Sequence, residues 1–229
     1  MQQSVLVMAF AFFWGSISLA AGDASNDVRE FKELHCSVAL PDKECKWIDP
    51  SKLPGCIAAF KDSTGTVLVL LVSDSPGDTT ITTEFTKGYD EGAFESGVAS
   101  KLAGEIISFR NIPCYQVHSK IEKDGAIGTT RVFLAHGRLY QLQAVGSRLP
   151  LDQRNQLGSL FNSFNFLSPP LPVDPTQKTP ATAAPRPFNP GSDFRTGRIG
   201  GIIAACCVIG IVGILLVRAV VRKRKNNRA

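Results

Sequence analysis

An uncharged apolar run near the end of the chain constrains its architecture more than any other feature. Residues 199–217 read IGGIIAACCVIGIVGILLV, which is 19 residues without a charged side chain. At about 1.5 Å per residue, a helix of this length spans roughly 28 Å, close to the thickness of the hydrocarbon core of a bilayer. A soluble helix of this length normally carries a polar stripe. The run therefore predicts one C-terminal transmembrane helix.

Basic side chains follow the apolar run directly, and they predict its orientation. Five of them are Arg218, Arg222, Lys223, Arg224 and Lys225. Because the positive-inside rule places such residues in the cytoplasm, residues 218–229 are expected to form a short basic cytoplasmic tail. The tail serves either as a stop-transfer anchor alone or also as an attraction to anionic lipid.

The first 22 residues have the pattern of a secretory signal peptide. Residues 5–13 are apolar, and small residues lie among those from Gly15 to Gly22. An apolar stretch followed by small residues is typical of a cleaved export signal. Because no Lys or Arg precedes the apolar stretch, an uncleaved anchor helix is the alternative. The export signal predicts the same orientation as the tail: a single-pass membrane protein whose N-terminal domain lies outside the cytoplasm.

Proline concentrates just before the apolar run. Eight of the 14 prolines lie between Pro169 and Pro190. Such a composition favours extended, polyproline-like geometry and does not build a core. We therefore expect residues 168–198 to be a linker between a folded domain, residues 23–167, and the membrane. The linker either lets the domain reach a partner or simply holds it away from the lipid.

The charge distribution argues against a nucleic-acid-binding domain. The formal net charge of the chain is +5, but residues 23–167 contain 15 basic and 18 acidic side chains. The positive charge therefore belongs to the linker and the tail. A nucleic-acid-binding domain needs a basic patch on its folded part.

Apolar runs predict a set of β-strands in residues 23–167. The runs 56–60 and 66–73 surround a turn and predict a hairpin, and residues 79–85 are expected to form a short strand. Three further expected strands cover residues 114–122, 129–135 and 139–145. Asp-Gly and His-Gly pairs separate these three runs, which is typical of tight turns between antiparallel strands.

Two helices complete the expected domain. Four apolar residues recur at every fourth position: Phe94, Val98, Leu102 and Ile106. This spacing predicts a helix that starts near Asp90. A second helix is expected over residues 150–161, followed by a short strand or helix end at residues 164–167. The fold class is therefore α+β, with helices packed on an antiparallel sheet.

Two stretches of the domain carry a family resemblance. The stretch RVFLAHGRLYQLQAVG, followed by LGSLFNSFNFL, resembles the C-terminal half of the PsbP-like α/β/α-sandwich superfamily, and Ala59-Phe60-Lys61-Asp62 is similar to an earlier part of its pattern. The resemblance covers about residues 36–167. It implies a non-enzymatic binding or scaffolding domain and carries over no site residue. The chain has no Asn-x-Ser/Thr sequon, which favours a bacterial-type membrane protein.

Four cysteines lie in the expected extracytoplasmic domain: Cys36, Cys45, Cys56 and Cys114. In an oxidising compartment four cysteines predict two disulfides, for which there are three possible pairings. We expect Cys36–Cys45, because the two are close in sequence, together with Cys56–Cys114, because each begins a strand. In a compartment without oxidising machinery they would instead be buried thiols.

No catalytic, metal or cofactor motif is found in the sequence, so no catalytic, metal-ligating or cofactor-binding residue is predicted. Cys114 and His118 share a strand face, but about 13 Å separates residues four apart on a strand, which is too far for proton transfer.

In the apolar run, the small residues between Gly201 and Gly213 predict a face through which two helices can approach closely.

The sequence thus predicts a membrane-tethered extracytoplasmic binding or scaffolding domain without catalytic activity. The expected partner, besides the membrane, is another envelope or secreted protein. Two alternatives stay open. One is a thiol-active or redox-active protein that uses the four cysteines, and the other is a structural envelope spacer that forms a homodimer through its transmembrane helix.

Overall fold

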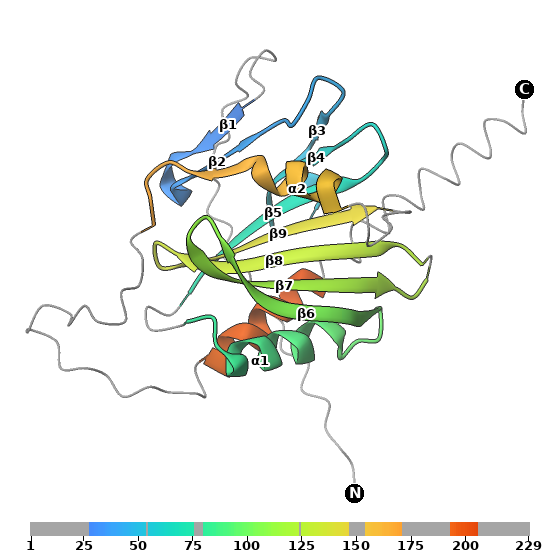
Figure 1. Ribbon diagram of the computed structural model, residues 1–229, viewed down its shortest axis with the longest axis vertical. Coiled ribbons are helices and arrows are strands. Elements are labelled where there is room, and N and C mark those ends of the chain that lie inside the picture. The colour runs from blue at the N-terminus through green and yellow to red at the C-terminus, as the bar shows by residue number, and fades with distance from the viewer. Residues whose placement is uncertain are drawn as a thin grey trace, which may run out of the picture.

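The computed structural model describes residues 28–53, 55–75, 80–123, 125–146, 154–170 and 193–205. Its largest feature is an antiparallel sheet with the strand order β3-β4-β5-β9-β8-β7-β6 (Figure 1). These strands are β3 (Lys46–Ile48), β4 (Cys56–Lys61), β5 (Val67–Asp74), β6 (Ala99–Phe109), β7 (Ile112–Ile121), β8 (Ile127–Ala135) and β9 (Arg138–Gly146). A smaller antiparallel sheet, in the order β1-β2-β10, contains β1 (Val28–Phe31), β2 (Cys36–Ala39) and β10 (Phe164–Phe166).

The helices lie on both faces of the large sheet (Figure 1). They are α1 (Thr83–Phe94) and α2 (Arg154–Asn162), with two short 3-10 turns, η1 (Lys32–Leu34) and η2 (Pro50–Lys52). Helix α2 and the small sheet share one apolar cluster with one face of the large sheet, whereas α1 packs in a separate cluster on the opposite face. The prediction of an α+β domain with helices packed on an antiparallel sheet is confirmed.

The predicted hairpins are confirmed. Strands β4 and β5 pair antiparallel, as do β7 with β8 and β8 with β9. At the β8–β9 connection His136 has a φ of 50° and Gly137 a φ of 69°. Positive φ at both central residues is the geometry of a type I′ turn, whose twist matches that of the flanking strands. The His-Gly pair therefore sets the register of this hairpin.

The prediction for the segment between β5 and β7 was wrong. Residues 83–94 form α1 instead of ending a strand, and residues 99–109 form β6 instead of continuing a helix. Thr82 begins α1, because its hydroxyl oxygen accepts a hydrogen bond from the backbone N–H of Phe85 at 3.2 Å. Gly97, with a φ of 67°, follows the helix end. A spacing of four fits one face of a strand as well as one face of a helix, because it is a multiple of two.

The other predicted elements close the domain on the α2 side. Helix α2 is described from Arg154, and β10 corresponds to the short strand expected near residues 164–167. The ring of Phe133 stacks on that of Tyr140, with 5.4 Å between centroids, and Phe164 meets Phe133 edge-on at 5.3 Å. These contacts bind the small sheet to the large one, so one face of the large sheet is filled by aromatic side chains.

A further helix, residues 193–205, lies beside α1 on the opposite face of the sheet (Figure 1). It begins at Asp193, six residues before the predicted transmembrane helix and inside the range expected to be linker. No helix of the described residues is long and apolar enough to cross a membrane. The predicted signal peptide, residues 206–217 of the predicted transmembrane helix and the whole basic tail lie outside the described residues.

Candidate interaction face

Helix α1 and the helix of residues 193–205, called here the C-terminal helix, touch through their backbones. A Cβ atom on Gly88 would overlap the carbonyl oxygen of Phe194, and one on Gly92 would overlap that of Arg198. The contact is reciprocal, because a Cβ on Gly197 or Gly201 would overlap a carbonyl oxygen of α1. Any side chain at these four positions would push the two helices apart.

The spacing of these glycines explains the geometry of the contact. Gly88 and Gly92 are four residues apart, as are Gly197 and Gly201, so each pair lies on one helix face. Gly197 meets Phe85 and Gly201 meets Tyr89, so the two helices run parallel. Small residues at this spacing allow close helix packing and Cα–H···O contacts. The sequence pattern predicted that Gly201 contributes to a contact between two transmembrane helices, whereas in the structure it lies against α1.

A buried carboxylate joins the beginnings of the two helices. Asp193 is 2% exposed. Its carboxylate accepts hydrogen bonds from the Thr82 hydroxyl at 3.1 Å and from the Thr80 backbone N–H at 3.4 Å. Thr82 is also the residue that caps α1. One threonine hydroxyl therefore connects the first turn of α1 to the first turn of the C-terminal helix.

Two further hydrogen bonds fix the C-terminal helix along its length. The Arg198 guanidinium donates to the Glu95 carboxylate at 2.9 Å, in an ion pair open to solvent. Beneath the helix, the Gln141 side-chain amide of β9 donates to the backbone carbonyl of Gly200 at 3.1 Å. The exposed ion pair contributes little to stability, whereas the buried amide bond contributes about 1 kcal/mol.

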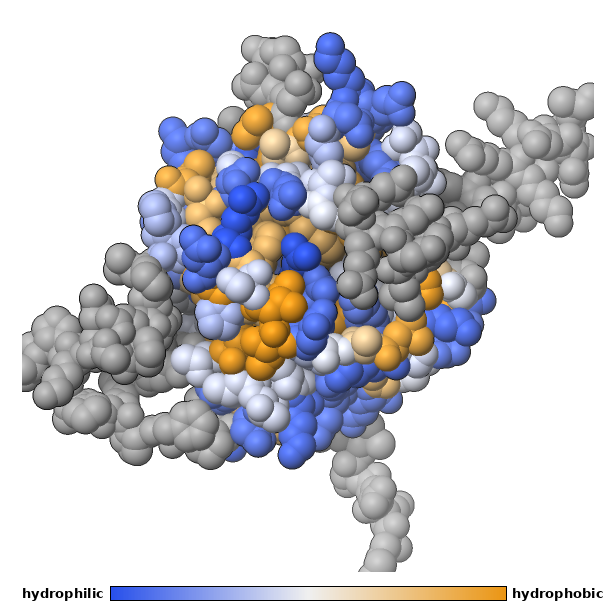
Figure 2. Space-filling model, viewed as in Figure 1, coloured by the Kyte–Doolittle hydropathy of each residue, from blue (hydrophilic) through white to orange (hydrophobic). Residues whose placement is uncertain are grey.

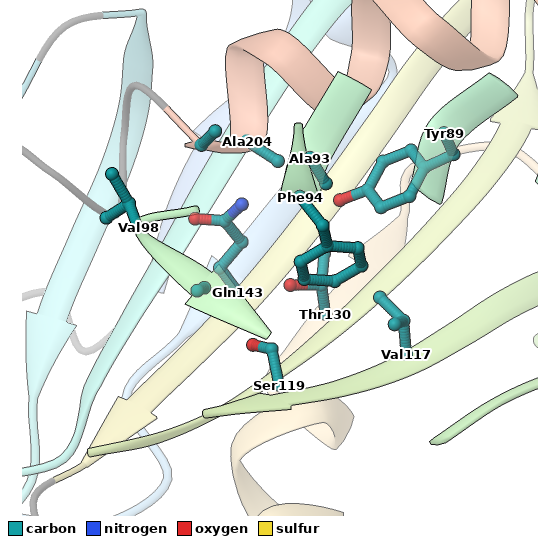
Figure 3. Close-up of a pocket in the computed structure, with 11 residues that line it drawn as sticks. Tyr89, Ala93, Phe94, Val98, Val117, Ser119, Thr130, Gln143 and Ala204 are labelled. Atoms are coloured by element: carbon teal, nitrogen blue, oxygen red, sulfur yellow. The ribbon is translucent and has the colours of Figure 1, made fainter. Parts of the chain in front are cut away.

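Gln143, two residues further along β9, lines a small pocket between the sheet and the ends of both helices (Figure 3). The pocket has a free volume of about 20 Å³, which is room for one water molecule. Its lining includes the hydroxyls of Ser119 and Thr130 and, from the C-terminal helix, Ala204 and Ala205. Gln143 is 1% exposed, and neither atom of its amide has a hydrogen-bond partner in the described part of the chain.

A polar strip on the sheet therefore lies under the C-terminal helix, between two apolar clusters. The strip consists of Gln141, Gln143, Thr130 and Ser119. Ala204 belongs to the cluster that contains Phe85 and Tyr89 of α1. Ile203 packs against the second cluster, which contains residues of β5 and the end of β9. The helix thus bridges two apolar clusters and covers polar side chains in between.

Comparisons with known proteins find structural similarity at low sequence identity. No protein-family model matches this sequence, and no curated protein matches it. Cyanobacterial PsbP (CyanoP) from Synechocystis sp. PCC 6803 is similar in structure with 18% identity and a TM-score of 0.47, covering 64% of this chain and 95% of that one. The Ran-binding protein Mog1p of Saccharomyces cerevisiae has 8% identity and a TM-score of 0.41, covering 62% and 96%. Neither likeness carries a function over.

The structure does not bring the four predicted disulfide cysteines together in the expected pairs. Cys56 lies on β4 and Cys114 on β7, with three strands between them, so about 19 Å separates them, beyond the reach of a disulfide. Cys36 and Cys45 share one apolar cluster, and no disulfide joins them. Cys56 donates its thiol hydrogen to the Ala58 carbonyl at 3.1 Å.

Burial also sets the acidity of three of these thiols. It raises the pKa of Cys36 and of Cys114 to about 12 and that of Cys45 to about 11. For Cys45, hydrogen bonding to Asp42 adds to the effect of burial. Reactive cysteines need a lowered pKa, because the thiolate is the nucleophile. These three side chains therefore behave as apolar core residues.

The remaining polar residues singled out in the sequence have structural partners. His118 lies on β7 and its Nδ1 is 2.9 Å from the Thr129 hydroxyl. Asp90 accepts hydrogen bonds from Lys101 at 2.6 Å and from the Tyr115 hydroxyl at 2.7 Å. That hydroxyl is buried, and burial together with Asp90 raises the pKa of Tyr115. The basic residues Arg218, Arg222, Lys223, Arg224 and Lys225 lie outside the described residues.

Sequence reasoning missed Gly88, Gly92, Gly197 and the two glutamines of this face, and it assigned Gly201 to a different contact. The signal was present: two Gly-x-x-x-Gly motifs lie in segments more than 100 residues apart. The motif at Gly88 and Gly92 was overlooked because it straddles the start of the helix that was expected to begin near Asp90. Gln141 and Gln143 alternate with apolar residues, and this pattern gave no sign that their face would be buried.

Proposed function

We propose that this protein is a non-catalytic binding or scaffolding domain held at a membrane by residues 199–217, with the domain outside the cytoplasm. The proposal combines an apolar segment long enough to span a bilayer with an α+β domain that offers a long sheet edge with no paired strand among the described residues. The partner we propose is another envelope or secreted protein.

The observation that carries the binding role is the exposed edge strand β6. It has 11 residues, and within the described sheet it pairs only with β7. Leu102 is 45% exposed and Ile106 is 48% exposed. Figure 2 shows apolar surface in the region of β6 and β7. Natural sheet edges are usually short or charged, and an open edge with apolar side chains is suited to pairing with a strand of another protein.

The same strand also carries features that limit its pairing. Leu102 lies in a bulge, because Lys101 pairs with Ser119 and Ala103 with the neighbouring His118. Lys101 forms an ion pair with Asp90 at the start of this bulge. A bulge and a charge at one end restrict uncontrolled pairing and leave residues 104–108 as the segment open to a specific partner.

The redox alternative receives no support from the described cysteines. Three of them are buried in the core and have raised thiol pKa values. The fourth, Cys56, lies on β4, far across the sheet from Cys114. The spacer alternative needs the small-residue face of the apolar run, and Gly201 of that face is occupied by α1.

In-cell crosslinking of the tagged full-length protein tests the binding role. We expect one dominant partner, and we expect Ile106→Lys to remove it because a charge would replace an apolar contact. The matched control is Val28→Lys, because Val28 is 47% exposed and lies on β1 of the other sheet. Loss of the partner in both variants, or in neither, would contradict a binding surface on β6.

A further inference from the structure

The helix of residues 193–205 contains seven residues of the apolar segment that we propose spans the membrane. These are residues 199–205, and they are docked on the domain. If they stay docked, only residues 206–217 remain for the lipid. Those 12 residues form a helix of roughly 18 Å, far short of the roughly 30 Å core of a bilayer. The docked arrangement and the full span therefore exclude each other.

We propose that the groove between α1 and the polar strip is a binding site for this chain's own membrane segment, and that the groove and the lipid compete for residues 199–205. The proposal rests on the membrane tethering given above. In one state the segment lies in the groove, and in the other it leaves the groove and completes a transmembrane helix.

The groove fits this particular segment. Gly88 and Gly92 admit a helix that has no side chain at the matching positions. The C-terminal helix supplies Gly197 just before the segment and Gly201 within it. Gly200 lies against the Leu139 side chain, where a Cβ would be only 2.9 Å away. Glycines at positions 197, 200 and 201 therefore give the C-terminal helix a shape that a helix with larger side chains would not reproduce.

The described part of the C-terminal helix runs along β9 toward an apolar cluster. The helix follows β9, from Leu139 beneath Gly200 to Gln143 beside Ala204 and Ala205. Val145 comes next on the same face and belongs to the apolar cluster that Ile203 touches. Residues 206–217 are the chain that follows, and they are apolar.

The polar strip makes the docked state reversible. Among the described residues, the docked helix covers Gln143 and supplies no hydrogen-bond partner to either atom of its amide, which opposes docking. When the helix leaves, water satisfies Gln143, Gln141, Ser119 and Thr130. A permanently buried face would be apolar, like the face under α2, which is filled by Phe133, Phe164 and their neighbours. The groove thus binds the segment, and the free energy needed to release it stays small enough for lipid to compete.

Crosslinking in the full-length chain tests the competition. Glu95→Cys and Arg198→Cys place two thiols where an exposed ion pair now joins α1 to the C-terminal helix. In a background with Cys206→Ser and Cys207→Ser, a short bis-maleimide should link the two positions in the absence of lipid. The lipid that competes with the groove is supplied as vesicles of phosphatidylcholine and phosphatidylglycerol. The vesicles are washed with high salt to remove protein that is bound only by charge. In the vesicle-bound fraction we expect at least a fivefold loss of the crosslink.

A glycine variant tests the groove itself. Gly88→Ala places a Cβ against the Phe194 carbonyl, so we expect less crosslink without lipid and a severalfold larger vesicle-bound fraction. Gly158→Ala on α2 is the matched control, because nothing lies within 4 Å of its added Cβ, and it should behave as the parent protein. Vesicle-bound protein that keeps its full crosslink, or Gly88→Ala protein that matches the control, would overturn the competition. Absence of vesicle binding in every variant would instead overturn the tethering.

Discussion

Gly92 of α1 lies directly against the backbone carbonyl of Arg198 in the C-terminal helix, with no room for a Cβ between them. Gly158 of α2 has the opposite surroundings, because its Cβ would meet nothing within 4 Å. Both glycines are in helices and neither has a positive φ. The two positions therefore allow the effect of helix propensity to be separated from that of close packing.

Replacing each of these glycines by alanine should change stability in opposite directions. Alanine favours a helix over glycine by about 1 kcal/mol, so Gly158→Ala should raise the free energy of unfolding by about 0.5–1 kcal/mol. Gly92→Ala gains the same propensity but forces the helices apart, so we expect a net loss of about 1–3 kcal/mol. Urea unfolding followed by circular dichroism measures both. Equal shifts for the two variants would mean that the glycine contact does not form in solution.

Gln141 and Gln143 give a second matched pair, because they lie on the same face of β9 and differ in their partners. Gln141→Leu removes the hydrogen bond to the Gly200 carbonyl and should lower the free energy of unfolding by about 1–2 kcal/mol. Gln143→Leu removes an amide that has no partner in the described residues and should raise it by about 1 kcal/mol. Thermal unfolding of both variants checks the sign. A destabilising Gln143→Leu would show that the amide is satisfied in solution.

The buried thiols predict a loss of stability at alkaline pH. The pKa of Cys36 and of Cys114 rises from 9.0 to about 12 on folding, so the unfolded chain loses these protons first as the pH rises. Because the folded state then binds more protons than the unfolded state, the unfolding free energy should fall between about pH 9 and pH 12, by up to about 1.4 kcal/mol per pH unit for each thiol.

Burial also raises the pKa values of Tyr115 and Tyr140, and alanine variants separate the contribution of the thiols from that of these tyrosines. Cys36→Ala and Cys114→Ala lower stability at pH 8 through the lost packing, but the slope of stability against pH above pH 9 should become shallower. Urea midpoints at pH 8 and pH 10 for the parent and each variant provide the comparison. If the slope of stability against pH is the same in the variants as in the parent, the thiols are in contact with solvent in the folded protein.

The sequence predicted most of this fold because its strongest signals are local. The His136-Gly137 turn and the apolar runs on either side of it specify a hairpin without reference to the rest of the chain. The C-terminal helix could not be placed in the same way. Its contact with α1 joins Gly92 to Arg198 across more than 100 residues, and its apolar character favours lipid and the groove equally. The position of β6 was missed because Leu102 and Ile106 fit both helical and strand spacing.

The last prediction concerns Thr82, which connects the two helix N-termini. Its hydroxyl oxygen accepts from the Phe85 N–H, and its hydroxyl hydrogen is donated to the buried Asp193 carboxylate. Thr82→Val keeps the shape but removes both interactions, so we expect a loss of about 2–3 kcal/mol: about 1 kcal/mol for the cap and the rest for a buried carboxylate deprived of a donor.

Thr86→Val is the matched control for this change, because among the described residues the Thr86 hydroxyl bonds only to the Thr83 carbonyl of the same helix. Its effect on the free energy of unfolding should stay within about 0.5 kcal/mol. A double variant, Thr82→Val with Asp193→Asn, then tests whether the two helix ends are joined as described. Because a neutral amide costs less to leave without a donor than a carboxylate, the second change should recover part of the loss. If the double variant lost as much stability as the Thr82→Val and Asp193→Asn single variants together, that result would contradict the Thr82–Asp193 contact.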